Sequence, residues 1–211
     1  MAEERDSDAA TAPTQLSGAI LAGGKSTRMG SNKALMRLNG EPMIARVARV
    51  LSSCRAIDEV MLITSAPADY VFLNLPAHGD FYFGKGPLAG IHSALRHARH
   101  ARVLMVACDL PFITAALLDY LCAESAAHEI TALESEKGVE PLCAVYAKSC
   151  TAAIERQLLE GRLKVAEIFD KVNTRIMKLE PSLPGYRPHL FTNVNTPEDF
   201  SATVEALGDS S

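Results

Sequence analysis

The sequence has no excess of positive charge and no long apolar segment. Its 21 Lys and Arg residues against 25 Asp and Glu residues give a formal net charge of −4, which excludes a general electrostatic field for binding nucleic acid or an anionic membrane. The longest strongly apolar run, at 103–108, has six residues, whereas a helix that crosses a bilayer needs about 20. We therefore expect no nucleic-acid partner and no membrane association.

Cysteine is sparse and shows no pairing pattern. The five cysteines are an odd number, and no two are spaced as C-x-x-C, which disfavours both a disulfide framework and a structural zinc site. Most lie in apolar runs, where cysteine is typically a small core residue. The N-terminus also lacks the basic and then apolar regions of a secretory signal. These features predict a cytoplasmic protein.

The overall composition is that of a folded globular protein. Of the 211 residues, 48% are hydrophobic and 22% are charged, and this length suits a single domain. Residues 1–15 are rich in Ala, Thr, Asp and Glu and show no apolar period, so we predict a disordered tail there. Residues 16–211 are predicted to form one domain whose last few residues are again disordered.

Short apolar runs alternate with longer helical patterns from residue 16 onward. This alternation predicts an α/β fold, with helices crossing over a sheet. The last predicted helix begins at Thr196, where a hydroxyl residue precedes Pro and an acid follows. The expected strands are 17–21, 60–64, 102–107, 129–133, 142–147, 175–179 and 191–194, with a short strand and turn in 34–40. The other expected helices are 42–53, 87–100, 114–125, 149–159 and 163–169.

A glycine-rich, basic loop at 21–33 follows the first predicted strand. Its two adjacent glycines allow backbone N–H groups to approach a phosphate closely, and Lys25, Arg28 and Lys33 add three cations without an acid. Ligands of open α/β sheets bind at the carboxyl ends of the strands, where this loop is expected. The loop matches neither the Walker A nor the G-x-G-x-x-G pattern. It predicts a phosphate site, and the alternative is a basic surface loop.

Asp109 comes directly after the apolar strand predicted at 102–107. Its carboxylate is therefore expected at the carboxyl edge of the sheet, where an oxygen donor suits Mg²⁺ shared with substrate phosphates. The alternative is an aspartate that only forms the turn before the next helix.

Two further segments are compatible with ligand binding. Asn195, in the segment 193–197, follows the last predicted strand and could ligate a metal ion or accept from its water. Helix capping is the alternative for this residue. The segment 84–90 is a glycine-rich turn into a helix N-terminus, which could face a base, a ribose or a phosphate, or serve only as a turn.

Taken together, these segments resemble one family, the molybdenum cofactor guanylyltransferases (MobA). The resemblance runs from residue 16 to about residue 207, and the segment 161–165 is also similar to a family motif, G-x-R-x-V. Each motif alone is weak, but four of them occur in the family's order and spacing. They are LAGG-K-S-x-RMG-x-x-K at 21–33, GPLAG at 86–90, C-D-x-P at 108–111 and NVNTPE at 193–198.

The resemblance implies a fold, a reaction and a cofactor. The fold is a Rossmann-like three-layer α/β/α sandwich of the nucleotidyltransferase type, with a mixed, mostly parallel sheet. The reaction is the transfer of GMP from GTP to the terminal phosphate of molybdopterin. It releases pyrophosphate, uses Mg²⁺ and forms the guanine dinucleotide form of the cofactor. Molybdoenzymes or their chaperones would be further partners.

The resemblance also implies roles for particular residues. Asp109 would bind GTP and Mg²⁺, and Asp80, the acid upstream of GPLAG, matches a nucleotide-binding acid of the family. Lys33 would contact the phosphates. On charge alone, Lys25, Arg28 and Lys33 would neutralise the triphosphate, so Arg28 and Lys33 are expected to act in catalysis with Asp109. The remaining nucleotide contacts would be Leu21, Ala22, Gly23, Gly24 and Lys25, and the candidate acceptor contacts are Arg162, Lys164 and Asn195.

The chain departs from the family at two positions. Asn32 stands where the family often has Asp, which removes one negative charge beside the phosphates. Ile63 falls near a family Asn that contacts the nucleotide, so Thr64 or Ser65 would have to substitute for it.

Two alternative functions remain open from the sequence. One is a related nucleotidyltransferase that uses CTP on molybdopterin or an NTP on a sugar phosphate. The adjacent glycines at 23–24 favour the guanylyl branch, because cytidylyl relatives commonly read LAAG. The other is a nucleotide-binding protein without catalysis, because fold alone does not fix function.

Overall fold

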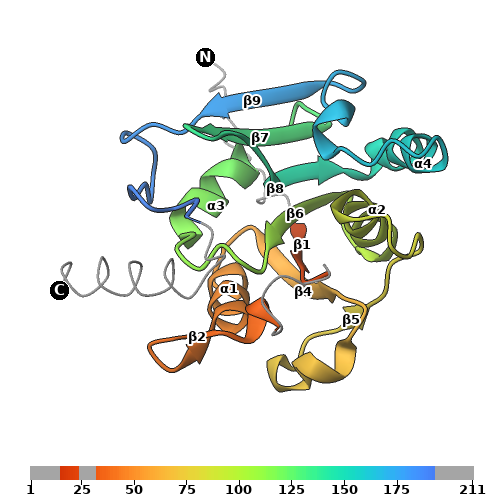
Figure 1. The fold of residues 1–211 in the computed structure, drawn as a ribbon. Coiled ribbons are helices and arrows are strands. Elements are labelled where there is room, and N and C mark those ends of the chain that lie inside the picture. Colours follow the sequence, from red (N-terminus) through yellow and green to blue (C-terminus); the bar gives the residue numbers. More distant parts are fainter. Residues whose placement is uncertain (1–14, 24–31, 193–211) are drawn as a thin grey trace, which may run out of the picture.

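The computed structural model of this protein describes residues 15–23 and 32–192. Its main feature is a seven-stranded mixed sheet with the strand order β5-β4-β1-β6-β8-β7-β9 (Figure 1). The first four strands in this order are parallel, β8 is antiparallel to both β6 and β7, and β9 is parallel to β7. The strands are β1 (Leu16–Leu21), β4 (Ile57–Ile63), β5 (Ala77–His78), β6 (Arg102–Ala107), β7 (Ile130–Ser135), β8 (Gly138–Ala147) and β9 (Thr174–Lys178).

Helices cover both faces of the sheet (Figure 1). The helices α1 (Met43–Ser52) and α3 (Ala115–Ala123) pack on one face, and α2 (Pro87–His97) and α4 (Thr151–Leu159) pack on the other. Because successive side chains of a strand point to opposite faces, β6 sends Leu104 and Val106 to the first core and Val103 and Met105 to the second. This arrangement confirms the three-layer α/β/α fold and the mixed, mostly parallel sheet.

The boundaries of several elements differ from the predicted ones. β4 begins at Ile57, three residues before the predicted start. β8 begins at Gly138, because residues 136–137 form the turn of a hairpin with β7. The charged Glu140 and the proline at 141 interrupt the apolar run and obscure this start in the sequence. α2 ends at His97 rather than at residue 100, because Ala98 leaves the helical conformation with ψ at 143°.

Short elements account for most of the remaining differences. The segment expected as a strand and turn at 34–40 begins with the 3-10 turn η1 (Lys33–Leu35) and continues into a small hairpin, β2 (Arg37–Leu38) with β3 (Glu41–Pro42). The 3-10 helix η2 (Pro67–Leu73) and strand β5 lie in a region without a predicted element. The helix expected at 149–159 begins with the 3-10 turn η3 (Lys148–Cys150) and continues as α4. The helix expected at 163–169 is the shorter 3-10 helix η4 (Val165–Ile168).

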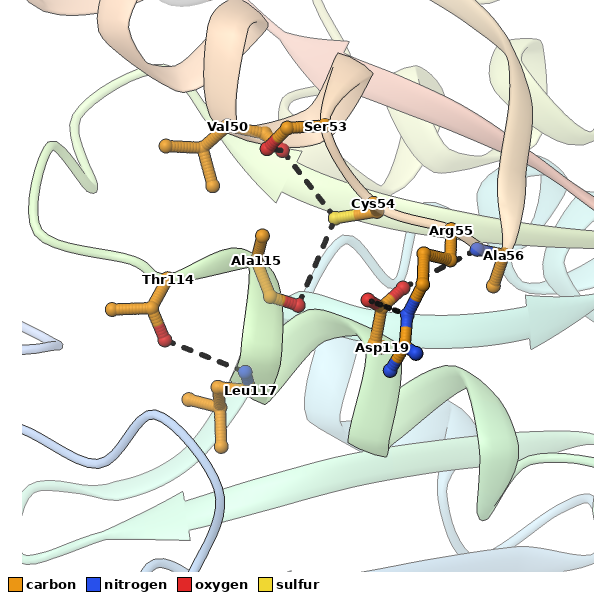
Figure 2. A network of polar contacts seen from close by, with 9 residues as sticks. All are labelled: Val50, Ser53, Cys54, Arg55, Ala56, Thr114, Ala115, Leu117 and Asp119. Atoms are coloured by element: carbon orange, nitrogen blue, oxygen red, sulfur yellow. Dashed lines mark hydrogen bonds and ion pairs between the residues drawn. The ribbon is translucent and has the colours of Figure 1, made fainter.

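Polar contacts join the end of α1 to α3 (Figure 2). The Asp119 carboxylate accepts a hydrogen bond from the Ala56 backbone N–H at 3.2 Å and pairs with Arg55 at 3.4 Å. The Cys54 thiol lies 3.4 Å from the Val50 carbonyl oxygen and 3.9 Å from that of Ala115. These contacts fix the connection from α1 to β4 against the first turns of α3.

The predicted cap of α3 is confirmed. The Thr114 hydroxyl accepts from the Leu117 N–H at 3.4 Å and donates to the Gly185 carbonyl at 2.9 Å, which ties the segment after β9 to this helix. The expected core role of the cysteines also holds for four of the five, Cys54, Cys122, Cys143 and Cys150, which are buried. Burial raises the pKa of the Cys54 thiol to about 12.

Some predictions fall on parts of the chain that the structure does not describe. They are the tail up to residue 14, the second half of the strand expected at 191–194, and the helix expected from Thr196; the described residues of that strand, Phe191 and Thr192, are not in a strand. Within residues 15–23 and 32–192, no helix has the length and apolar character that a membrane span requires.

Candidate active site

The carboxyl ends of the central parallel strands form the edge where the sequence places a ligand. The Leu21 carbonyl accepts from the Cys108 N–H at 3.2 Å, and the Ala22 N–H donates to the Ile63 carbonyl at 2.9 Å. The chain after β1 therefore leaves the sheet between β4 and β6. Ala22 is half-buried and Gly23 is exposed at this point, so the backbone at 21–23 lies at the strand-end edge predicted for the nucleotide.

Lys33 and Asp109 meet at this edge. The Lys33 ammonium lies 2.6 Å from Asp109 Oδ2, and the two side chains are 21% and 18% exposed. Lys33 begins η1, and Asp109 follows β6 after a single intervening residue. The structure thus joins the last cation of the basic loop to the acid predicted to bind the metal ion. Both groups remain partly accessible to a ligand.

Asp80 lies on the other side of the segment 21–23. A methyl group added to Gly23 would lie 4.0 Å from Asp80 Oδ2, and one added to Gly90 of α2 would lie 3.8 Å from Oδ1. Oδ1 is buried and has no hydrogen-bond partner among the described residues. This burial raises the pKa of Asp80 above its ordinary value. A buried carboxylate oxygen without a donor is an acceptor that a ligand can satisfy.

The departure at Asn32 has a structural explanation. The Asn32 side-chain oxygen accepts from the Ala34 N–H at 3.2 Å and caps η1, while its amide nitrogen donates to the Tyr70 hydroxyl at 2.8 Å. Tyr70 belongs to η2 and is buried. The amide therefore caps η1 and joins it to η2. The Tyr70 hydroxyl also lies 3.2 Å from Asn32 Oδ1, where a carboxylate could accept from it, so only the hydrogen bond donated by the amide nitrogen requires Asn.

Ile63 stands near the position of the family Asn, and one of the two candidate substitutes for that Asn is exposed. The Ile63 side chain is buried in the core between the sheet and α2. Thr64 is also buried, and its hydroxyl accepts from the Ala66 N–H at 3.1 Å. Ser65 is exposed just beyond the end of β4. Of the two residues considered as substitutes for the family Asn, Ser65 is the one at the surface.

The donor set fits a metal ion that is shared with phosphate groups. The described residues contain no cluster of three or more His, Cys, Asp or Glu that could hold a metal ion alone. Asp109 offers a carboxylate at the strand-end edge, and Mg²⁺ typically binds proteins through one or two carboxylates together with substrate phosphates and water. Asp109 therefore fits Mg²⁺ arriving with a nucleotide.

The candidate acceptor residues Arg162 and Lys164 lie in the segment after α4. Arg162 pairs with Glu160 and also lies 3.6 Å from Glu167. The Gln157 amide donates to the Lys164 carbonyl at 2.9 Å and fixes this segment against α4. Four of the predicted site residues, Gly24, Lys25, Arg28 and Asn195, lie outside the described residues.

The segment beside Asp80 contains contacts that the sequence analysis missed. The Tyr82 hydroxyl donates to Glu155 Oε1 of α4 at 2.7 Å, and the Phe81 N–H donates to the Ser93 hydroxyl of α2 at 3.0 Å. Glu155 and Ser93 lie on helices that were predicted correctly in kind. No motif or periodicity links either residue to the position of Asp80.

A separate cavity lies elsewhere in the structure. It has a volume of about 540 Å³ and is lined by the first residues of β1 and β6, Leu16 and Arg102, together with residues of α3 such as Asp119 and Cys122. It therefore lies at the opposite edge of the sheet from Asp109. Its lining contains none of the site residues predicted in the described part of the chain.

Comparison with known proteins supports one family. A family profile described as the MobA-like NTP transferase domain matches residues 18–174. A probable molybdenum cofactor guanylyltransferase of Carboxydothermus hydrogenoformans is 37% identical over 189 residues, covering 89% of this chain and 94% of the relative. A molybdenum cofactor guanylyltransferase of Desulfosudis oleivorans is 35% identical over 196 residues, covering 91% and 96%.

Solved structures resemble the fold over nearly its whole length. The molybdopterin-guanine dinucleotide biosynthesis protein A of Archaeoglobus fulgidus superposes with a TM-score of 0.75 at 26% identity, covering 92% of this chain and 100% of that one. A CMP:2-keto-3-deoxy-manno-octonic acid synthetase in complex with CTP superposes with a TM-score of 0.72 at 12% identity, covering 94% and 100%. At 12% identity this second likeness concerns the fold alone.

Proposed function

We propose that this chain, which belongs to the MobA-like NTP transferase family, transfers GMP from GTP to the terminal phosphate of molybdopterin. The guanylyltransferase relatives match about nine-tenths of the chain. The observation that carries the residue assignment is the contact between Lys33 and Asp109 beside the backbone at 21–23, with the unpaired oxygen of Asp80 on the other side. This grouping offers a cation for phosphates, a carboxylate for a metal ion and an acceptor for a base.

The chemistry asks the protein mainly to position two anions. An oxygen of the acceptor phosphate attacks the α-phosphorus of GTP, the bond from that phosphorus to the bridging oxygen breaks, and pyrophosphate leaves. The attacking group is already a phosphate, so a strong base is not needed. Rate enhancement then depends on alignment and on neutralising negative charge.

Lys33 neutralises charge on the triphosphate and on the leaving pyrophosphate. Its ammonium is held at the strand-end edge by Asp109. The backbone at 21–23 lies beside it and approaches the nucleotide closely, because Gly23 has no side chain. Arg28, Gly24 and Lys25 are proposed to add contacts to the phosphates, because this loop carries cations and adjacent glycines that allow backbone N–H groups to approach a phosphate.

Asp109 is the proposed ligand of Mg²⁺. When bound there together with the triphosphate oxygens, Mg²⁺ supplies charge neutralisation. Asp109 contributes a carboxylate whose backbone is set by the buried strand β6. Its pairing with Lys33 keeps the carboxylate at the same edge before the nucleotide arrives.

Asp80 is the proposed acceptor for the guanine base. Guanine presents a ring N–H and an amino group side by side, and a carboxylate can accept from both. Cytosine and uracil do not present this pair of donors. The buried Oδ1 of Asp80, which has no hydrogen-bond partner within residues 15–23 and 32–192, would gain one from the base.

The acceptor phosphate is assigned to the segment after α4. Arg162 and Lys164 are the proposed contacts, with Asn195 as a third candidate. A phosphate would compete with Glu160 and Glu167 for the Arg162 guanidinium. A cytoplasmic location and delivery of the product to molybdoenzymes or their chaperones stay predictions.

The test is nucleotide choice. The purified chain is incubated with molybdopterin and Mg²⁺ and with GTP, CTP, ATP or UTP, and the release of pyrophosphate and the formation of the dinucleotide are measured. We expect GTP to be preferred. Equal turnover of CTP would favour the cytidylyl alternative, and binding of a nucleotide without turnover of any of the four would favour the non-catalytic one.

A further inference from the structure

The segment 80–82, called the Asp80 segment here, is held by hydrogen bonds to two helices. The Phe81 N–H donates to the Ser93 hydroxyl of α2 at 3.0 Å, and the Tyr82 hydroxyl donates to Glu155 Oε1 of α4 at 2.7 Å. Both contacts lie on the C-terminal side of Asp80, within two residues of it. They connect its backbone to the layer of helices that covers this face of the sheet.

Aromatic packing supports the same segment. The His92 ring meets the Phe81 ring edge-on at 5.9 Å and the Tyr82 ring at 5.1 Å. The Phe81 ring also stacks on His97, with centroids 5.0 Å apart, and the Arg96 guanidinium lies 5.5 Å from the Phe81 ring. The Asp80 segment therefore packs along the length of α2.

His92 serves as a packing surface rather than as a hydrogen-bonding group. It is 1% exposed, and neither ring nitrogen has a hydrogen-bond partner among the described residues. Its Nε2 lies 3.9 Å from Glu155 Oε1, beyond hydrogen-bond distance. Burial lowers the pKa of His92, which favours a neutral ring beneath Phe81 and Tyr82. Glu155 is thus left to bind the Tyr82 hydroxyl.

Asp80 itself needs such support. A carboxylate oxygen buried without a donor is unfavourable, and the side chain would gain free energy by turning toward water. Asp80 Oδ1 has no donor among the described residues. Contacts made by its neighbours in the chain can supply the restraint that keeps this oxygen buried beside Gly90.

We propose that Tyr82 and Glu155 are positioning residues for Asp80 and that they determine how well the site selects guanine. Neither residue touches the nucleotide in this proposal. Their hydrogen bond fixes the backbone after Asp80, so that the carboxylate stays at the place where it meets the base. This inference rests on the proposed function, because it concerns the base contact of the same site.

The selectivity of the site provides a readout that a purely structural role would not change. A carboxylate that is correctly placed accepts from the ring N–H and from the amino group of guanine, whereas hypoxanthine lacks the amino group. A site built around a hydrogen-bonding group discriminates against a ligand that leaves this group unpaired. A displaced Asp80 carboxylate therefore lowers the preference for GTP over ITP.

The experiment compares substitutions at the two ends of the hydrogen bond. Tyr82→Phe removes the donor, Glu155→Ala removes the acceptor, and Glu155→Gln keeps an acceptor oxygen. Tyr120→Phe, on α3 at the opposite face of the sheet, is the matched control. We expect Tyr82→Phe and Glu155→Ala to raise KM for GTP about fivefold and to reduce the preference over ITP similarly, with kcat within about twofold. Glu155→Gln and Tyr120→Phe are expected to behave like the wild type.

A double-mutant cycle tests whether the effect passes through Asp80. If it does, Tyr82→Phe has no further effect on KM or on selectivity in an Asp80→Asn background. An unchanged preference for GTP in folded Tyr82→Phe, or an equal effect in the Asp80→Asn background, overturns the inference while the wild type still uses GTP. Failure of the proposed function is distinguishable, because the wild type itself would then transfer no GMP.

Discussion

Replacing Asp109 by Asn tests the proposed metal ligand with the smallest change in shape. Asn keeps the size of the side chain and can still form turn hydrogen bonds, but it removes the negative charge. In the protein that charge lies 2.6 Å from the Lys33 ammonium. The substitution therefore has two separable effects, one on the ion pair and one on the binding of Mg²⁺ with the triphosphate.

The effect on stability is expected to be small. The two side chains are 21% and 18% exposed, so water screens the pair and remains available to Lys33 when the charge of its partner is lost. A partly exposed pair of this kind contributes about 1 kcal/mol or less to the free energy of unfolding. If Asp109 served only as a turn residue and partner of Lys33, this loss would be the whole effect.

The effect on activity is expected to be larger. Removal of one preorganised electrostatic group typically lowers kcat by about a hundredfold, which corresponds to about 2.7 kcal/mol of transition-state stabilisation. This exceeds the expected loss from the ion pair. The concentration of Mg²⁺ needed for the half-maximal rate is also expected to rise, because the proposed metal site loses its charged ligand.

The assay measures GMP transfer at saturating GTP across a titration of Mg²⁺, beside denaturant unfolding of the same samples. Asp119→Asn is the matched control, because Asp119 also pairs with a cationic side chain, that of Arg55, is 16% exposed, and lies on α3 away from the site. It should lose similar stability and keep its activity. A folded Asp109→Asn protein with near-normal GMP transfer and unaltered Mg²⁺ dependence would refute the metal role and the mechanism built on it.

The other predictions concern three residues. Lys33→Ala should lower kcat/KM for GTP at least about tenfold, or about 1.4 kcal/mol, while circular dichroism shows an unchanged fold; wild-type kinetics would contradict its phosphate role. Burial raises the pKa of Asp80, so the folded protein binds the carboxyl proton more tightly than the unfolded chain does. The free energy of unfolding of the wild type should therefore fall as pH rises from about 3.9, the ordinary pKa of Asp, to the raised pKa of the folded protein. Unfolding of Asp80→Asn across pH should lack this loss, with higher stability than the wild type at neutral pH and weaker GTP binding by calorimetry. Gly18→Ala should lower the free energy of unfolding by about 1–3 kcal/mol through overpacking, because the added carbon would lie 2.8 Å from Leu51 Cδ2. An unchanged midpoint in urea unfolding would show that the Leu51 side chain moves aside without cost.

Much of the site could be predicted because its residues come directly after the carboxyl ends of parallel strands. The apolar run before Asp109 predicts a buried strand, and the carboxyl ends of parallel strands share one edge of a sheet. The glycines and cations before Lys33 follow the first strand in the same way. The two residues were therefore expected at one edge, although only the structure gives their direct contact.

The support of Asp80 could not be predicted by the same reasoning. β5 is only two residues long, His78 being the second, so it shows no period that would identify it. Tyr82 and Glu155 are 73 positions apart and belong to no common motif. Their contact depends on how α4 packs against α2, and amphipathic patterns determine which face of a helix is buried rather than which polar side chains meet.

Because β8 is antiparallel to its neighbours, the residues proposed for the nucleotide and those proposed for the acceptor phosphate lie in separate parts of the chain. Cys143 of β8 pairs with Val106 of β6, so the first residues of β8 extend past the edge where β6 ends. Among the described residues, those proposed for the nucleotide end at Asp109, whereas those proposed for the acceptor phosphate come after β8. Exchanging residues 160–165 with those of a relative would therefore replace the proposed acceptor contacts Arg162 and Lys164 and keep both Asp109 and the Glu155 partner of Tyr82. Evolution could change what receives the nucleotide without altering which nucleotide is chosen.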